Sequence, residues 1–231
     1  MKIVISVVSH GQHKLVQRLL DSLDIFLKNQ ENEVLIVITE NAPVEEKYFS
    51  KKLKLHKIFN LRSKGFGANH NAVFEKFDSD LFLIVNPDTI LVDFFDLDLI
   101  HSLVQENEID LCSPVIKSPR GGVEDYKRAD LTFFNLLKRK IFKNHAEKFD
   151  WFSGIFLIVR SESFRKLKGF DTDFFMYVED CDLSMRARKA GMKVDDIEEF
   201  SIVHDARRAT RTNVKHLKWH VVSLLRYWFL K

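Results

Sequence analysis

Three short apolar runs constrain the fold of this chain more than any other feature of its sequence. They occupy residues 3–8, 34–39 and 81–85, are rich in β-branched side chains, and each ends at polar residues. Between the first two runs, apolar residues recur at helical spacing from Leu15 to Phe26. Strands that are apolar on both faces and alternate with helices are typical of parallel sheets covered by helices. The sequence therefore predicts an α/β fold with a mostly parallel central sheet flanked by helices.

Length and composition favour a single domain with a full core. The chain has 231 residues, of which 45% are hydrophobic. Its formal net charge is only +3, so the overall charge does not require a nucleic-acid partner. Cys112 and Cys181 match no metal-ligand spacing and favour a reducing compartment. We therefore expect a cytoplasmic protein. Because no apolar run reaches the roughly 18 residues of a membrane span, any membrane contact is expected to be peripheral.

Polar side chains follow each of the three apolar runs. Ser9 and His10 follow the first, Glu40 and Asn41 the second, and the turn from Asn86 to Asp88 the third. Ligands of such sheets bind at the carboxyl ends of the strands, where these residues are expected to converge. Each alone is compatible with ordinary turn chemistry, but three together favour a ligand site.

A glycine- and asparagine-rich loop lies between the second and third runs. Gly65 and Gly67 allow close approach of the backbone to a ligand, and we expect a helix to open at Ala72 and Val73. The loop lacks both the Gly-Lys-Ser/Thr ending of a phosphate-binding Walker loop and the spacing of a dinucleotide-binding turn.

An acidic cluster among aromatic residues follows another apparent buried strand, residues 151–160. The acids are Asp171, Asp173, Glu179, Asp180 and Asp182. Desolvation raises carboxylate pKa values, so this setting suits a general base, and the same acids could hold a divalent cation. The alternative is the acidic first turn of a helix, since residues 178–190 fit a helix that stops at Gly191.

Further along, residues 193–197 and 200–204 have the character of two short strands, the second ending at His204. A lone histidine is more often structural than a ligand. A histidine at a strand end, with Asp88 at another, keeps the ligand interpretation open.

Taken together, these segments resemble family 2 glycosyltransferases of the GT-A fold, in particular the bacterial rhamnosyltransferase-like members that build surface polysaccharides. The likeness covers nearly the whole chain in order. It is carried by residues 4–11, Glu40-Asn41-Ala42, the loop from Asn60 to Asn71, Asn86-Pro87-Asp88-Thr89, Trp151 to Gly154, and Gly169 to Asp182.

The resemblance implies an inverting transfer of a sugar from a nucleotide-diphospho-sugar, dTDP-rhamnose or a UDP-sugar, to a saccharide acceptor. It assigns donor binding to Ser9, His10, Glu40, Asn41, Gly65, Asn71, Asn86 and Asp88. A divalent metal, Mn²⁺ or Mg²⁺, would be held by Asp88, with His204 as a second ligand or a diphosphate contact. Asp180 is the first choice as catalytic base and Glu179 the second. Trp151, Gly154 and Phe175 would line the acceptor site, although core packing is an equal alternative for Trp151 and Phe175.

Three residues depart from the family pattern. Glu40 stands where aspartate is usual, and His10 where tyrosine is usual, which leaves the base preference open. Asn86 replaces the first acid of the Asp-x-Asp form, so Asp88 is the carboxylate left for a metal.

The predicted organisation is one domain over residues 1–231. Residues 1–116 form the nucleotide-binding half, residues 117–205 the acceptor and catalytic half, and residues 206–231 a C-terminal basic amphipathic helical segment. Such a helix can lie on an anionic membrane, which suits a lipid-linked acceptor, or can simply pack with a solvated basic face.

Three other functions compete with sugar transfer. Nucleotidyl transfer also uses α/β folds and carboxylates, but its basic glycine-rich signature is not found near residue 1 of this sequence. A catalytically degenerate nucleotide-binding or membrane-docking module is compatible with Asn86. A nucleic-acid binder would need a recognisable reading motif, which the sequence lacks, so no nucleic-acid partner is expected.

Overall fold

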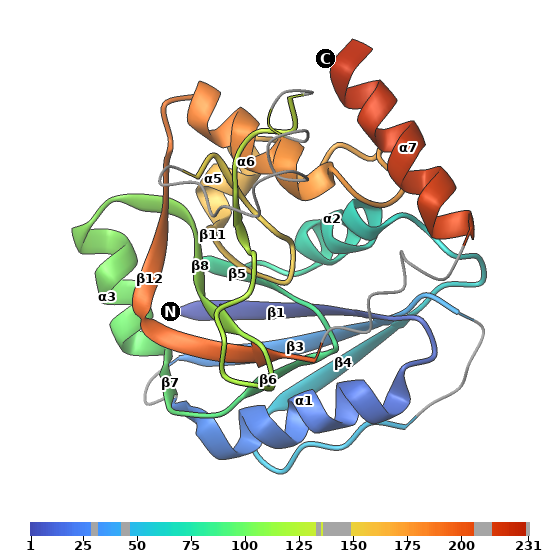
Figure 1. Cartoon of the computed structure of the whole chain (residues 1–231). Coiled ribbons are helices and arrows are strands. Elements are labelled where there is room, and N and C mark those ends of the chain that lie inside the picture. The colour runs from blue at the N-terminus through green and yellow to red at the C-terminus, as the bar shows by residue number, and fades with distance from the viewer. Residues whose placement is uncertain (29–31, 43–46, 133–134, 136–148, 206–213, 230–231) are drawn as a thin grey trace.

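The computed structural model describes residues 1–28, 32–42, 47–132, 135, 149–205 and 214–229. An eight-stranded sheet runs through these residues (Figure 1). In spatial order its strands are β4 (Lys54–Phe59), β3 (Glu33–Glu40), β1 (Lys2–Ser9), β5 (Leu81–Val85), β11 (Phe156–Arg160), β8 (Ile109–Lys117), β12 (Lys193–His204) and β6 (Thr89–Leu91). Two small pairs join β2 (Leu27–Lys28) to β7 (Phe95–Asp96), and β9 (Lys127–Arg128) to β10 (Trp151–Phe152).

The three apolar runs form β1, β3 and β5, which lie side by side and parallel as predicted. All five residues of β5 are buried because both faces of this strand are covered. The sheet as a whole is mixed, because β11 runs antiparallel to β5 and β8, and β6 runs antiparallel to β12. An apolar run carries no information about strand direction, so the sequence did not reveal these reversals.

Helices cover both faces of the sheet (Figure 1). On one face α1 (His13–Phe26) buries the helically spaced residues predicted from the sequence, Leu15, Val16, Leu19, Leu20 and Leu23. The opposite face carries α2 (Phe66–Lys76), α5 (Ser161–Lys166) and α6 (Glu179–Lys189). The other described helices are α3 (Leu97–Glu106) and α7 (Val214–Phe229).

Two predicted boundaries were wrong. Helix α2 begins at Phe66 and not at Ala72, so Gly67 lies in its first turn. A Cβ on Gly67 would lie 2.5 Å from the Cβ of Phe170, so this glycine permits close packing of the helix. The two strands expected over residues 193–204 form one strand, β12, whose register against β8 shifts between Ile197 and Ser201.

The predicted helices near the C-terminus are confirmed where the structure describes them. Helix α6 ends at Lys189, before Gly191, which has a left-handed φ of +75°. Helix α7 covers residues 214–229, whereas the arginines at 207, 208 and 211 lie outside the described residues. Within the described part of the chain, no helix is long and apolar enough to cross a membrane.

Candidate functional site

The predicted donor residues gather at the carboxyl ends of β1, β3 and β5. Ser9 and Glu40 are the last residues of their strands and pair directly in the sheet. The strand ends are tied further, because the Asn41 N–H donates to the Ser9 carbonyl at 2.7 Å and the Asn60 N–H donates to the Glu40 carbonyl at 2.9 Å. The predicted donor residues at the ends of β1 and β3 are therefore neighbours at one edge of the sheet, as the sequence indicated.

Three asparagines lock the loop that follows β4. The Asn60 amide donates to the side-chain oxygens of Asn41 at 3.0 Å and Asn69 at 2.7 Å. Asn41 also accepts from the Lys64 N–H and donates to the Lys64 carbonyl, both at 2.8 Å. Asn41 therefore has a structural role beside its predicted donor contact, and Asn60 and Asn69 are part of the same scaffold.

Glu40 keeps an acceptor available at this edge. Its side chain is fully buried, and one carboxylate oxygen accepts a hydrogen bond from the Tyr48 hydroxyl. The other oxygen, Oε2, is buried without a hydrogen-bond partner among the described residues. A buried unpaired acceptor is costly, so this oxygen is well placed to accept a hydrogen bond from a ligand.

His10 extends from the same edge toward α7. Its Nε2 lies 3.5 Å from the Asn41 amide nitrogen. Partial desolvation lowers the pKa of His10, and the charge of His216 on α7 lowers this pKa further, although the His10 side chain remains exposed. Helix α7 thus borders the predicted donor site.

The turn after β5 brings Asp88 to His204. Nε2 of His204 lies 3.4 Å from Oδ1 of Asp88, and the Asp205 N–H donates to the Asp88 carbonyl at 2.9 Å. On its other side, Nδ1 of His204 lies 2.9 Å from Oε2 of Glu124. Burial alone would lower the pKa of His204, but the neighbouring carboxylates of Asp88 and Glu124 outweigh this effect and raise the pKa.

The two motifs predicted for the acceptor side contact each other. The Gly154 N–H donates to Oδ2 of Asp180 at 2.8 Å, and the Cys181 N–H donates to Oδ1 of Asp180 at 2.9 Å. Asp180 remains partly exposed, whereas Glu179 is only 5% exposed and its Oε2 has no hydrogen-bond partner among the described residues. The two neighbouring acids therefore differ in access to solvent.

Burial dominates the electrostatics of this pair. It raises the pKa of Glu179 well above its usual value, and the adjacent charge of Asp180 raises the Glu179 pKa further. Burial also raises the pKa of Asp180, although the hydrogen bond from Gly154 and the charge of Arg128 act against this rise. Raised carboxylate pKa values suit acids that exchange protons near neutral pH.

The backbone before the pair is strained. Tyr177 has a φ of +70° and Val178 a φ of +73°, a left-handed region that β-branched residues rarely occupy. Val178 is also the residue that precedes the first turn of α6. Such strain persists only where surrounding contacts hold the chain, and it is concentrated at functional sites.

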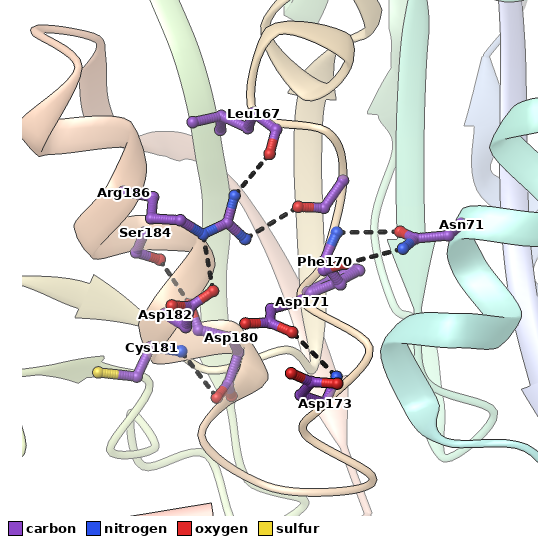
Figure 2. A network of polar contacts seen from close by, with 11 residues as sticks. Asn71, Leu167, Phe170, Asp171, Asp173, Asp180, Cys181, Asp182, Ser184 and Arg186 are labelled. Carbon is purple, nitrogen blue, oxygen red and sulfur yellow. Dashed lines mark hydrogen bonds and ion pairs between the residues drawn. The ribbon is translucent and has the colours of Figure 1, made fainter. Parts of the chain in front are cut away.

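Gly65 and Asn71, both predicted to bind the donor, lie against the acceptor-side segment. A Cβ on Gly65 would lie 2.6 Å from the carbonyl oxygen of Phe175, so only glycine fits there without displacement. The Asn71 amide donates to the Phe170 carbonyl at 2.8 Å and accepts from the Phe170 N–H at 2.9 Å (Figure 2). These contacts join the two halves of the chain, and a contact of either residue with the donor stays a prediction.

Arg186 anchors the loop before the acidic segment from within α6. Figure 2 shows its guanidinium between the carboxylate of Asp182 and the loop backbone. It bonds to Asp182 at 2.7 Å, to the Leu167 carbonyl at 2.7 Å and to the Gly169 carbonyl at 2.9 Å. Asp182 is therefore occupied by a structural ion pair.

The two predicted acceptor-site aromatics lie in different surroundings. Trp151 is 3% exposed, packs in a small cluster with Phe174 and Cys181, and donates from Nε1 to the Ala129 carbonyl at 2.8 Å. Phe175 is partly exposed and its ring lies 4.9 Å from that of Trp219 on α7. Of the two, Phe175 has the surface that a sugar ring could contact.

Several residues of the site carry no recognisable signal in the sequence. Glu124 is 80 positions from His204 in sequence, and Arg128 acts on Asp180 through its charge. Both lie in an irregular segment with no motif. The asparagines of the Asn60 to Asn71 loop were visible as a cluster, but their mutual hydrogen bonds were not.

Asp88 and His204 provide two of the ligands that a divalent metal ion would need. Among the residues that the structure describes, no three His, Cys, Asp or Glu side chains are grouped to hold a metal ion. Asp88 and His204 nevertheless offer one oxygen and one nitrogen 3.4 Å apart, and the Asp88 Oδ1 has no hydrogen-bond partner among the described residues. Ligands at right angles around Mg²⁺ lie about 3 Å apart, so the pair fits as two ligands of one ion. Glu124 on Nδ1 then has the place of the carboxylate that commonly orients a metal-binding histidine.

No model of a known protein family matches the sequence. The chain is 27% identical to the rhamnosyltransferase WbbL of Escherichia coli (strain K12), over 97% of this chain and 92% of that protein. The chain is thus similar over nearly its whole length to a bacterial rhamnosyltransferase.

A shorter match supports the same relationship. An N-acetylglucosaminyl-diphospho-decaprenol L-rhamnosyltransferase of Mycobacterium tuberculosis (strain CDC 1551 / Oshkosh) is 38% identical over 71 residues, which is 30% of this chain and 23% of that protein.

Solved structures establish the fold as GT-A. The mannosyltransferase PcManGT of Pyrobaculum calidifontis, solved in complex with GDP-Man and Mn²⁺, superposes with a TM-score of 0.65 at 16% identity. The match covers 99% of this chain and 64% of the PcManGT chain. The predicted GT-A fold is thus confirmed, and the mixed sheet is its form here.

Proposed function

We propose that this chain is an inverting, metal-assisted glycosyltransferase that uses a nucleotide-diphospho-sugar, dTDP-rhamnose or a UDP-sugar, in cell-surface polysaccharide synthesis. The rhamnosyltransferase names of its relatives support the reaction class. The Mn²⁺ and GDP-Man bound in PcManGT support a diphosphate donor and a metal.

One observation carries the proposal: the predicted donor turn and the predicted base meet through two consecutive residues. The Asn86 N–H donates to the Ile155 carbonyl at 2.9 Å. The next residue back, Gly154, donates to the Asp180 carboxylate at 2.8 Å. A donor diphosphate near Asp88 and an acceptor hydroxyl near Asp180 would therefore lie at one site.

Asp88 and His204 are the residues that would hold the metal. With a divalent cation bound, these two residues would hold a positive charge that offsets the charge developing on the leaving diphosphate. His204 is kept in place by Glu124, and Asp88 is kept in place by its backbone contact with Asp205. The chain thus supplies a prepared pair of ligands next to the end of β5.

Asp180 would accept the proton of the acceptor hydroxyl. The backbone N–H groups of Gly154 and Cys181 fix its orientation, and each carboxylate oxygen keeps a further lone pair for the incoming proton. Proton removal as the hydroxyl attacks the anomeric carbon favours a single displacement, which inverts that carbon.

The acceptor in this proposal is a lipid-linked saccharide. The decaprenol in the name of the mycobacterial relative supports it. Such an acceptor requires the enzyme to work at the inner face of the cytoplasmic membrane, in peripheral contact with it.

Nucleotide binding provides the test. We would measure the unfolding temperature with dTDP, UDP, GDP or ADP, each with Mn²⁺ or with EDTA, for the intact chain and for Asp88→Ala. The proposal expects one nucleotide to raise the unfolding temperature only with Mn²⁺, and this rise to vanish in Asp88→Ala. Asp93→Ala serves as a control, because this acid lies five positions away in the same region.

Transfer from the matching donor then tests catalysis. Asp88→Ala and Asp180→Asn should each lower turnover at least about a hundredfold. No stabilisation by any nucleotide, with or without Mn²⁺, would refute the proposal, whereas nucleotide binding without transfer would favour the degenerate nucleotide-binding module.

A further inference from the structure

Helix α7 exposes more apolar surface than an ordinary surface helix. The one buried residue within this described helix is Ser223. Its outward face carries exposed apolar side chains, from 36% exposed at Trp228 to 76% at Phe229. The members of this outer face are Leu217, Val221, Val222, Leu225, Trp228 and Phe229. A surface helix normally buries such residues and exposes polar ones.

Polar contacts account for the orientation of α7. Ser223 donates to the Met176 carbonyl at 2.9 Å, and the Tyr177 hydroxyl lies 2.6 Å from Nδ1 of His216. Tyr227 donates to Asp130 at 2.6 Å. Together with the packing of Leu224 against the cluster that contains Phe174, these bonds fix one side of α7 against the protein, so the apolar outer face is directed away from it.

The charges on α7 indicate what covers the outer face. The helix contains no acidic residue, and both Lys215 and Lys218 are exposed. Trp228 donates from Nε1 to the Leu131 carbonyl and keeps part of its ring exposed at the rim. Apolar side chains with flanking lysines are the composition of helices that lie in the interface of an anionic bilayer.

We propose that the outer face of α7 docks on an anionic membrane and places the acceptor side of the site next to the bilayer. The inference deepens the proposed function and rests on it for the lipid-linked acceptor. A second copy of the chain is a poorer occupant, because it would bring together the lysines of two helices without any acidic residue on either helix to offset them.

The location of α7 places the proposed membrane contact next to the acceptor side of the site. The contacts of Ser223 and His216 are with Met176 and Tyr177, directly before the acids Glu179 and Asp180. Phe175, the exposed aromatic of the predicted acceptor site, packs on Trp219 of the same helix. An acceptor held by its lipid in the bilayer would therefore meet the protein beside its base.

Vesicle co-sedimentation of the full chain tests the proposal. The probes are vesicles of phosphatidylcholine alone and of phosphatidylcholine with phosphatidylglycerol. The intact chain should pellet with the anionic vesicles, and Val221→Gln/Leu225→Gln should lower the partition coefficient about tenfold or more. Lys218→Gln should weaken binding to anionic vesicles and leave weak binding to neutral ones unchanged.

The matched control is Ile25→Gln/Val92→Gln. Both residues are exposed to a similar degree, and Ile25 lies on α1, on the other side of the sheet from α7 (Figure 1). This control should pellet like the intact chain. Equal pelleting of the two double variants, or no pelleting of the intact chain, would overturn the proposal. A dimer in sedimentation velocity that Val221→Gln/Leu225→Gln converts to monomer would assign the face to a second copy instead.

The docking and the sugar transfer can fail separately. Asp180→Asn should pellet with anionic vesicles as the intact chain does, because docking does not use the base. Val221→Gln/Leu225→Gln should keep the nucleotide-dependent rise in unfolding temperature, which also shows that this variant is folded.

Discussion

Asp180 and Glu179 are neighbours in sequence but meet different surroundings. Asp180 is partly exposed and held by two backbone N–H groups, whereas Glu179 is buried with an unpaired oxygen. A base must reach a hydroxyl that arrives from outside, so access favours Asp180.

The first prediction separates the two acids. Asp180→Asn should lower kcat by about a hundredfold or more, since the amide accepts no proton, while Glu179→Gln should lower kcat by a smaller factor. Steady-state transfer assays with a saturating donor measure both. A larger loss in Glu179→Gln than in Asp180→Asn would reverse the assignment.

The second prediction concerns pH and stability. Burial raises the pKa of Glu179 above its value of about 4.3 in an unfolded chain, so the folded chain favours the protonated acid. This stabilisation is complete below the unfolded pKa and is lost as the pH rises through the folded pKa.

Glu179→Gln removes that titration. The variant should gain stability relative to the parent as the pH rises from about 4 to about 8, because the glutamine stays neutral throughout. Thermal unfolding of both proteins across this range measures the difference. A difference that does not change with pH would contradict a raised Glu179 pKa.

At the scale of elements, Arg186 fixes the position of α6 relative to the loop of residues 167–169, which precedes the acidic segment. Its three bonds hold Asp182, Leu167 and Gly169 together. Removal of the guanidinium leaves Asp182, which is 2% exposed, without its ion-pair partner.

The third prediction follows from that loss. Arg186→Ala should destabilise the chain by about 3 kcal/mol, because a buried carboxylate loses its partner. Lys189→Ala on the exposed side of α6 is the control and should change stability by less than about 0.5 kcal/mol. Denaturant unfolding provides both values. Similar losses in the two variants would show that the Arg186 bonds contribute little.

Some boundaries of helices and strands follow from the local sequence, and others do not. The strand ends at Ser9 and Glu40 were predictable because an apolar run and its polar stop are local signals. The start of α2 was not, because Gly67 has the composition of a loop but serves packing against Phe170. The pairing of Glu124 with His204 joins residues far apart, and no local pattern records it.

At the scale of the whole molecule, one sheet joins the predicted nucleotide half to the predicted acceptor half. Strand β5 of the first half pairs with β11 of the second along five residues. Asn71 and Phe170 add a second connection between the halves. If either half unfolded alone, the β5–β11 pairing and the contact between Asn71 and Phe170 would both break.

The fourth prediction is a single unfolding transition for the full chain. A nucleotide with Mn²⁺ at about a hundred times its dissociation constant stabilises the folded state by about 2.7 kcal/mol. The whole transition should then move by about 5 to 10 °C. Calorimetry with and without the ligand provides the measurement. Two transitions, of which the nucleotide moves only one, would mean that the halves are separate domains.

The direction of strand β11 determines which two segments of the chain meet at the site. Because β11 runs against β5, its first residue, Phe156, lies beside the last residue of β5, Val85. The segment that enters β11 and the turn that leaves β5 are therefore held together by the ladder itself. Insertions between β8 and β10 lengthen the chain without altering that ladder. The length of that connection can therefore vary during evolution while the donor turn and the segment that enters β11 stay side by side.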